Sequence, residues 1–161
     1  MSNRWSVSLC GIFFFVLPPA YAGQASEELA QAPFPAAQAE LERVIQGLAE
    51  DNMSRDIERI QALHLDSEKF SKFGPRSFER QDVDSANESE AAFFGSLEAV
   101  DYQVKDLKID VFGDVAVVTY YPQVAFIRDG ERTRASGRQT LVFLHTEAGW
   151  KIVHEHGTPS W

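Results

Sequence analysis

The feature that most constrains the fold is a change of sequence pattern after Gly95. Up to that point apolar residues recur at helical spacing, and beyond it runs of strand character are separated by tight-turn residues. Apolar and charged side chains alternate over residues 107–111, which predicts a half-buried strand. Asp129-Gly130 is typical of a two-residue hairpin turn. We therefore expect four antiparallel strands in a meander.

The second expected strand, residues 115–127, is apolar on both faces and predicts an interior position in the sheet. Proline has no backbone N–H, so we expect Pro122 at a bulge or where the strand leaves the sheet. The third strand covers residues 132–144, and Glu147-Ala148-Gly149 then turns the chain into the last strand.

The first half of the chain predicts helices. Apolar residues between Ala36 and Asp51 recur three and four positions apart, as in an amphipathic helix. A shorter helix follows, with His64 on its apolar side, and then an aromatic-rich segment with room for short strands. Ser85-Ala86-Asn87-Glu88 matches a capping box and predicts the start of a third helix. Helices followed by a meander make an α+β domain.

The N-terminus matches a secretory signal peptide. Arg4 precedes an apolar run from Val7 to Leu17, and Ala20-Tyr21-Ala22 has the small-x-small pattern of a cleavage site. The run is about half the length that a membrane-spanning helix needs. We expect residues 1–22 to be removed, and the protein to be exported to the periplasm or secreted, without membrane attachment after cleavage.

Residues 23–35 lack periodicity and contain Pro33 and Pro35, so we expect a flexible leader before one folded domain over residues 36–161. Cys10 is the single cysteine and lies in the signal peptide, which excludes disulfides and Cys-ligated metals from the mature chain. The net charge of −9 argues against nucleic acid as a partner.

The last strand carries two histidines at alternate positions. Because successive side chains of a strand point to opposite faces, we expect Trp150, Ile152, His154 and His156 to share one face. Both imidazoles are candidates for acid–base catalysis or for hydrogen bonds to a ligand. The alternative is that one packs and the other is solvated. Glu155 points the other way, so the pair lacks a third ligand and we expect no metal.

Polar residues on the other strands extend this candidate site. Arg132, Arg134 and Arg138 share one face unless Gly137 forms a bulge, and they either hold an acidic ligand or pair with surface carboxylates. We favour surface pairing for the first two and ligand contact for Arg138, which is nearer the sheet centre. The hydroxyl of Tyr120 is a further candidate ligand contact, although packing alone would also explain it.

His64 and Asp66 lie at the end of the second predicted helix. A hydrogen-bonded core histidine is the favoured interpretation of His64, ahead of a pocket-facing one. Asp66 would act as a base only if burial raised its pKa, and the neighbouring Ser67 and Glu68 indicate a solvated helix end instead.

This order of elements resembles the SnoaL-like branch of the superfamily shared by nuclear transport factor 2 (NTF2) and ketosteroid isomerase. The resemblance rests on residues 56–60, residues 64–66 and Phe70 near the start of the domain, and on residues 137–143 and 149–156 at its end. It covers about residues 36–157. It implies a cone-shaped NTF2-like fold, in which a curved sheet wraps around helices and leaves a pocket, often in a homodimer.

Members of this superfamily include isomerases, polyketide cyclases, dehydratases and modules without known chemistry. We therefore expect a homodimeric domain that binds a small, partly apolar ligand through Tyr120, Arg138, His154 and His156. The two histidines of the last strand are the best catalytic candidates for a cofactor-free reaction. The alternative is a non-catalytic homo-oligomeric assembly module.

Overall fold

The computed structural model describes residues 21–75 and 78–160. Most of the predicted signal peptide, residues 1–20, lies outside the described residues. Tyr21–Gln31 forms helix α1, where we expected an irregular leader, and it belongs to a separate unit from residues 32–161. The flexibility of the leader stays a prediction. Within the described residues, no helix is both long and apolar enough to span a bilayer.

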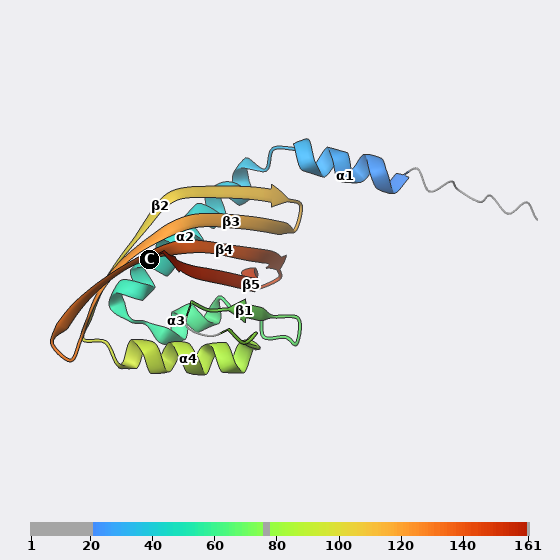
Figure 1. Ribbon diagram of the computed structural model, residues 1–161. Coiled ribbons are helices and arrows are strands. Elements are labelled where there is room, and N and C mark those ends of the chain that lie inside the picture. The colour runs from blue at the N-terminus through green and yellow to red at the C-terminus, as the bar shows by residue number, and fades with distance from the viewer. Residues whose placement is uncertain (1–20, 76–77, 161) are drawn as a thin grey trace, which may run out of the picture. The chain divides into compact units, whose positions relative to one another are not determined.

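Residues 32–161 form one α+β unit that contains all the other elements. The sheet has the strand order β1-β5-β4-β3-β2, with β1 parallel to β5 and the other neighbours antiparallel. It curves around the helices, as the sequence resemblance implied (Figure 1). The elements are α2 (Pro35–Ser54), α3 (Ile57–Ala62), β1 (Ser71–Phe73), α4 (Val83–Gly95), β2 (Ala99–Phe112), β3 (Val115–Arg128), β4 (Glu131–Thr146) and β5 (Gly149–Ser160).

The predicted turns of the meander are confirmed. Asp129 and Gly130 form the two-residue loop between β3 and β4 and have φ angles of 54° and 74°. Both central residues of a type I′ hairpin turn need positive φ, which Asp-Gly tolerates well. Gly149, with φ of 88°, closes the turn before β5.

The N-terminus of α4 differs from the prediction. Asp82 is the N-cap, and its carboxylate accepts a hydrogen bond from the backbone N–H of Ser85 at 2.9 Å. That hydrogen bond lowers the pKa of Asp82. The capping box predicted at Ser85 is therefore wrong, because an aspartate three residues earlier already satisfies the free N–H groups of the first turn.

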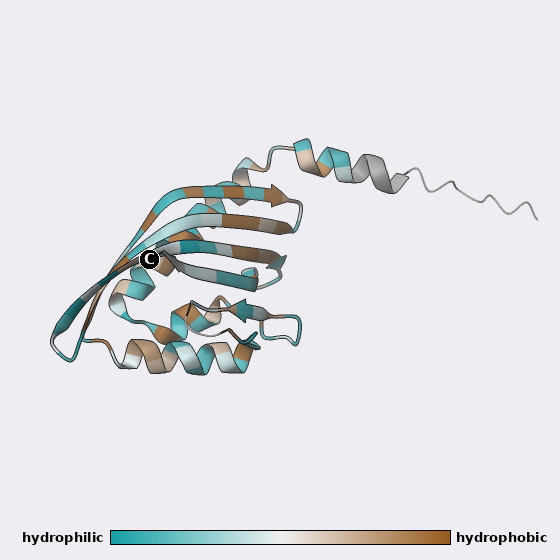
Figure 2. Ribbon diagram, viewed as in Figure 1, coloured by the Kyte–Doolittle hydropathy of each residue, from teal (hydrophilic) through white to brown (hydrophobic). Residues whose placement is uncertain are grey.

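The core lies between α2 and the inner face of the sheet, which we define as the face that carries Ala116, Val118 and Tyr120 of β3. Apolar and polar residues are interspersed along the strands (Figure 2), as expected of strands that cover a core on one side only. The outer face is the opposite one. The most deeply buried side chains are Leu41, Ile45, Val118, Leu141, Phe143 and Ile152.

A bulge in β5 overturns the predicted faces of the last strand. Val142 pairs with His154, but the next residue of β4, Phe143, pairs with Ile152, so Val153 is an extra residue. An extra residue reverses the alternation beyond it. Trp150 and Ile152 therefore point inward as predicted, whereas the two histidines do not share their face, and Glu155 does.

Pro122 lies at neither a bulge nor a strand end. It pairs with Val104 of β2, and on its other side the β3–β4 ladder lacks pairs between Tyr120↔Gln139 and Gln123↔Ser136 without any change of register. The missing N–H of the proline thus coincides with a local interruption of one ladder.

We expect Gly137→Ala to lower the free energy of unfolding by about 1–3 kcal/mol. A Cβ at Gly137 would lie 2.6 Å from the backbone carbonyl oxygen of Thr158, so the paired strand must shift. Gly47→Ala is the matched control, because a Cβ there has no neighbour within 4 Å and the residue lies inside α2. It should stabilise by roughly 0.5–1 kcal/mol. Urea unfolding measures both values, and equal effects would contradict the packing described for β4 and β5.

Candidate functional site

The inner face of the sheet borders a cavity of about 990 Å³ together with α3 and α4. We call it the inner cavity. Much of its wall is apolar, which is typical of a site for a small organic molecule. Its apolar lining includes Leu48, Ile60, Phe93, Phe94, Val100, Val124, Phe126, Leu141 and Ile152.

Four charged or ionisable residues meet in this cavity: His64, Lys72, Glu90 and Glu155. We call them the polar quartet. They come from four segments, namely the end of α3, β1, α4 and β5. The parallel pairing of β1 with β5 sets Lys72 opposite Glu155. The segment with His64 is joined to β5 by two backbone hydrogen bonds with Ile152, of 2.8 and 2.9 Å.

Contacts within the polar quartet link each cationic group to both carboxylates. The ammonium of Lys72 donates to Glu90 Oε1, and it lies 3.1 Å from Glu155 Oε1. His64 Nε2 lies 3.7 Å from Glu155 Oε2 and 3.8 Å from Glu90 Oε1. His64 Nδ1 lies 2.8 Å from Asn87 Oδ1, and because an amide oxygen only accepts, this nitrogen carries the proton. His64 is thus both a hydrogen-bonded core residue, as predicted, and part of the cavity wall.

Electrostatics favour the charged forms in this cluster. Burial by itself raises the pKa of Glu155, but the charge of Lys72 and the hydrogen bond with His64 outweigh it and lower the pKa to about 2. Burial by itself lowers the pKa of His64, but Glu155 and Glu90 outweigh it and raise the pKa above 6.5. The same two carboxylates raise the pKa of Lys72 against the effect of burial. With His64 protonated, two positive charges balance two negative ones.

The raised pKa of His64 predicts a loss of stability in alkali. The protonated imidazole stabilises the fold fully below its unfolded pKa of 6.5, and that contribution is lost as pH rises through the higher folded value. We therefore expect the free energy of unfolding to fall as pH rises above about 6.5. His64→Gln should flatten this dependence, and His156→Gln, on the exposed outer face, should keep it. Urea unfolding across the pH range is the measurement, and an unchanged slope in His64→Gln would refute the prediction.

Two tyrosine hydroxyls form the neutral polar part of the inner cavity. Tyr102 on β2 and Tyr120 on β3 are joined by a hydrogen bond of 3.1 Å between their oxygens. Burial raises the pKa of Tyr102 to about 12 and that of Tyr120 well above 10. Both stay protonated at neutral pH, so one hydroxyl proton remains free to donate to a bound oxygen atom. Tyr120 thus borders the inner cavity, and its role as a ligand contact stays a prediction.

The polar quartet contains three residues of the kinds that bind metals. Potential ligand atoms of His64, Glu90 and Glu155 all lie within 4.8 Å of one another. However, the ammonium of Lys72 contacts both carboxylates and supplies the positive charge that a metal would otherwise supply. This donor set therefore fits a buried lysine better than a divalent ion.

The two histidines of the last strand lie outside the inner cavity. His154 Nδ1 is 2.9 Å from Ser71 Oγ, and its ring lies 6.0 Å from that of Phe73. The exposed His156 contacts the same phenyl ring at 5.8 Å. The prediction that these histidines face the pocket together with Ile152 is wrong, because of the bulge at Val153.

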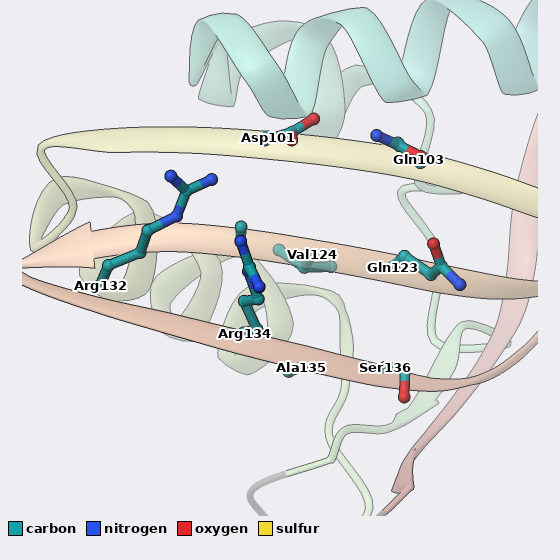
Figure 3. Close-up of a pocket in the computed structure, with 9 residues that line it drawn as sticks. Asp101, Gln103, Gln123, Val124, Arg132, Arg134, Ala135 and Ser136 are labelled. Atoms are coloured by element: carbon teal, nitrogen blue, oxygen red, sulfur yellow. The ribbon is translucent and has the colours of Figure 1, made fainter.

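The arginine row of β4 follows the prediction in register but not in its partners. The strand has no bulge at Gly137, so Arg132, Arg134 and Arg138 share the outer face. Figure 3 shows the first two beside Asp101 of β2 in an outer cavity of about 460 Å³. Within the described residues neither forms an ion pair, so the surface pairing favoured for them is not observed. Arg138 is exposed and borders the inner cavity.

Asp66 is exposed, as the interpretation of a solvated helix end required. Sequence reasoning missed Lys72, Glu90 and Tyr102 altogether and placed Glu155 on the wrong face. The one local signal was the parity of Tyr102, which lies on β2 two residues from the partly buried Val100 and Val104.

A family model described as "SnoaL-like domain" matches residues 41–159. The structure is similar to that of a putative dehydratase of the NTF2-like family from Streptomyces avermitilis, with 19% identity, a TM-score of 0.69, and coverage of 78% of this chain and 97% of that one. An NTF2-like superfamily protein from Salmonella enterica gives 20% identity and a TM-score of 0.71, covering 78% and 92%.

The association domain of C. elegans CaMKII is also similar, with 20% identity, a TM-score of 0.61, and coverage of 76% of this chain and 95% of that one. No curated protein matches the chain. These likenesses concern the fold, and they agree with the resemblance seen in the sequence.

Proposed function

Because the chain belongs to the SnoaL-like domain family, we propose that its inner cavity binds a small, largely apolar molecule that carries a carbonyl or hydroxyl oxygen. The observation that supports this proposal most is the gathering of the polar quartet and two tyrosine hydroxyls in a cavity with largely apolar walls. A few convergent polar groups in an apolar cavity are what a ligand of this kind requires.

The same groups suit cofactor-free acid–base chemistry. The hydroxyls of Tyr102 and Tyr120 would donate to the substrate oxygen and stabilise negative charge that develops there. His64 and Glu155 form a proton-transfer pair beside them, with Asn87 holding the imidazole in one orientation. Isomerisation, cyclisation and dehydration of a carbonyl compound are the reaction classes that such groups serve. The similar structures from Streptomyces avermitilis and Novosphingobium aromaticivorans are described as putative dehydratases.

Adjacent residues of β3 provide a matched pair of variants for testing the binding site. Val124 lines the inner cavity, whereas Ala125 lines only the outer one. We would titrate 2-acetylnaphthalene, an apolar ketone, into the mature protein and follow ligand fluorescence. Val124→Trp should weaken binding by at least about tenfold, because the indole fills the cavity, and Ala125→Trp should leave binding within about threefold.

Tyr120→Phe should weaken binding of the ketone by about threefold to tenfold, because it breaks up the donor pair. Thermal unfolding of each variant controls for folding. Equal binding by Val124→Trp and the parent protein, or the absence of binding by the parent, would contradict the proposed site.

A homo-oligomeric assembly role is the second candidate, and the outer face supports it. Phe112 and Val115 are each 40% exposed, and they pair across the β2–β3 turn. Exposed apolar residues on adjacent strands are typical of an interface. We propose a homodimer through this face. Val115→Glu should then dissociate it in sedimentation velocity, whereas Met53→Glu, on α2, should not. A monomeric parent protein would rule the proposal out.

Export also belongs to the proposal, on the basis of the N-terminal pattern of charge, apolar run and cleavage site. The mature protein should begin at Gly23 and be recovered from the periplasm or the medium. Intact mass spectrometry of the protein from its own host measures this directly, and a full-length intracellular chain would contradict export.

A further inference from the structure

Arg128 is a charged residue of the inner cavity that stands apart from the polar quartet. It is the last residue of β3, and its guanidinium carbon lies 5.4 Å from the ring centroid of Phe93 and 5.8 Å from that of Phe126. Two aromatic faces at these distances attract the cation and restrict its orientation. The guanidinium is therefore held in place among apolar side chains of the cavity wall.

The guanidinium of Arg128 has no anionic partner within the described part of the chain. Its Nε is buried and makes no hydrogen bond, and no carboxylate lies within ion-pair distance. Glu98, at the same end of the sheet, instead accepts a hydrogen bond from the backbone N–H of Gly130 at 2.9 Å. A buried donor without an acceptor costs free energy, and a bound anion would recover it.

We propose that Arg128 binds a carboxylate of the ligand, so that the molecules taken up by the inner cavity are apolar carboxylic acids. This inference rests on the proposed function and adds the chemical class of the ligand. The planar guanidinium presents paired N–H donors that match the two oxygens of a carboxylate. Lys72 already contacts both carboxylates of the polar quartet, so the cation that lies among apolar side chains of the described wall and can receive an acidic ligand is Arg128. Arg138 also borders the cavity, but it is exposed on the outer face of the sheet.

The position of Arg128 also sets where the two ends of the ligand lie. Phe93, which its guanidinium covers, is three residues from Glu90 on α4, or about 4.5 Å along the helix axis. Arg128 and the polar quartet therefore border one apolar space from neighbouring positions. A ligand with its carboxylate on Arg128 can direct a second oxygen toward the hydroxyls of Tyr102 and Tyr120.

The test compares 2-naphthoate with its neutral counterpart 2-naphthamide by isothermal titration calorimetry on the mature protein. We expect the parent protein to bind the carboxylate about tenfold or more tightly than the amide. Arg128→Gln should remove this preference while leaving amide binding within about threefold. Arg128→Lys keeps the positive charge but lacks the paired N–H donors of the guanidinium. It should give an intermediate loss of the preference for the carboxylate. Arg132→Gln, on the outer face, is the matched control and should change neither affinity.

The possible results separate carboxylate binding by Arg128 from ligand binding in the inner cavity. If Arg128→Gln binds naphthoate as tightly as the parent protein does, or if the parent prefers the amide, the carboxylate assignment is overturned while pocket binding stands. If Val124→Trp fails to weaken either compound, or neither compound binds the parent, the proposed function fails and the assignment fails with it. Should Arg128→Gln not fold, the Arg128→Lys comparison decides the assignment alone.

Discussion

Lys72→Met is expected to lower the free energy of unfolding by about 3–5 kcal/mol. The substitution removes the ammonium that contacts Glu90 and Glu155 and leaves two carboxylates close together in a cavity largely shielded from water. Removing one partner of a buried ion pair costs more than the pair contributes, because the remaining charge stays desolvated. Chemical denaturation at neutral pH measures the loss.

An exposed lysine provides the matched control for this prediction. Lys108 pairs with Asp110, and their side chains are 66% and 44% exposed. Lys108→Met should therefore change stability by less than about 1 kcal/mol. In addition, the double variant Lys72→Met/Glu155→Leu should recover part of the loss, because it removes one of the uncompensated charges. Similar effects at Lys72 and Lys108 would show that the polar quartet is not a buried ionic cluster.

Phe143→Ala should destabilise the fold by about 3–5 kcal/mol. Phe143 is fully buried, at 0% exposed, and lies on the inner face of β4 where the strand meets the bulge of β5. Truncation removes the transfer free energy of the ring and leaves a void among core residues.

The neighbouring Val142 is the control, because it points to the outer face and is only partly buried. Val142→Ala should cost less than half as much as Phe143→Ala in the same denaturation experiment. If the two costs were reversed, the faces assigned to β4, and with them the inward position of Glu155, would be wrong.

Local chemistry accounts for the parts of the fold that could be predicted from the sequence. The hairpin turn at Asp129-Gly130 is predicted correctly, because a turn that needs positive φ at two successive residues accepts few residue types. Helix α2 is predicted correctly, because its apolar stripe continues over several helical turns. The end of that helix is less well defined, because α2 continues to Ser54 and stops at Arg55, which adopts φ of 60°.

The candidate site depends on contacts that no local pattern reveals. One extra residue at Val153 exchanges the faces of His154 and Glu155, and nothing in the alternation of the last strand indicates it. Lys72 lies on a strand of three residues whose existence depends on parallel pairing with β5. Glu90 reaches the cavity from a separate element, α4. Only tertiary pairing brings these three charges together.

The proposed site requires that Glu155 and His64 face the inner cavity and that His154 and His156 face outward. The most direct measurement is an NMR titration that follows the ring C–H signals of the four histidines while 2-acetylnaphthalene is added. We predict that the His64 signals shift in proportion to binding while those of His154 and His156 stay in place. Shifts confined to His154 and His156, with His64 unchanged, would contradict the claim and return the site to the outer face.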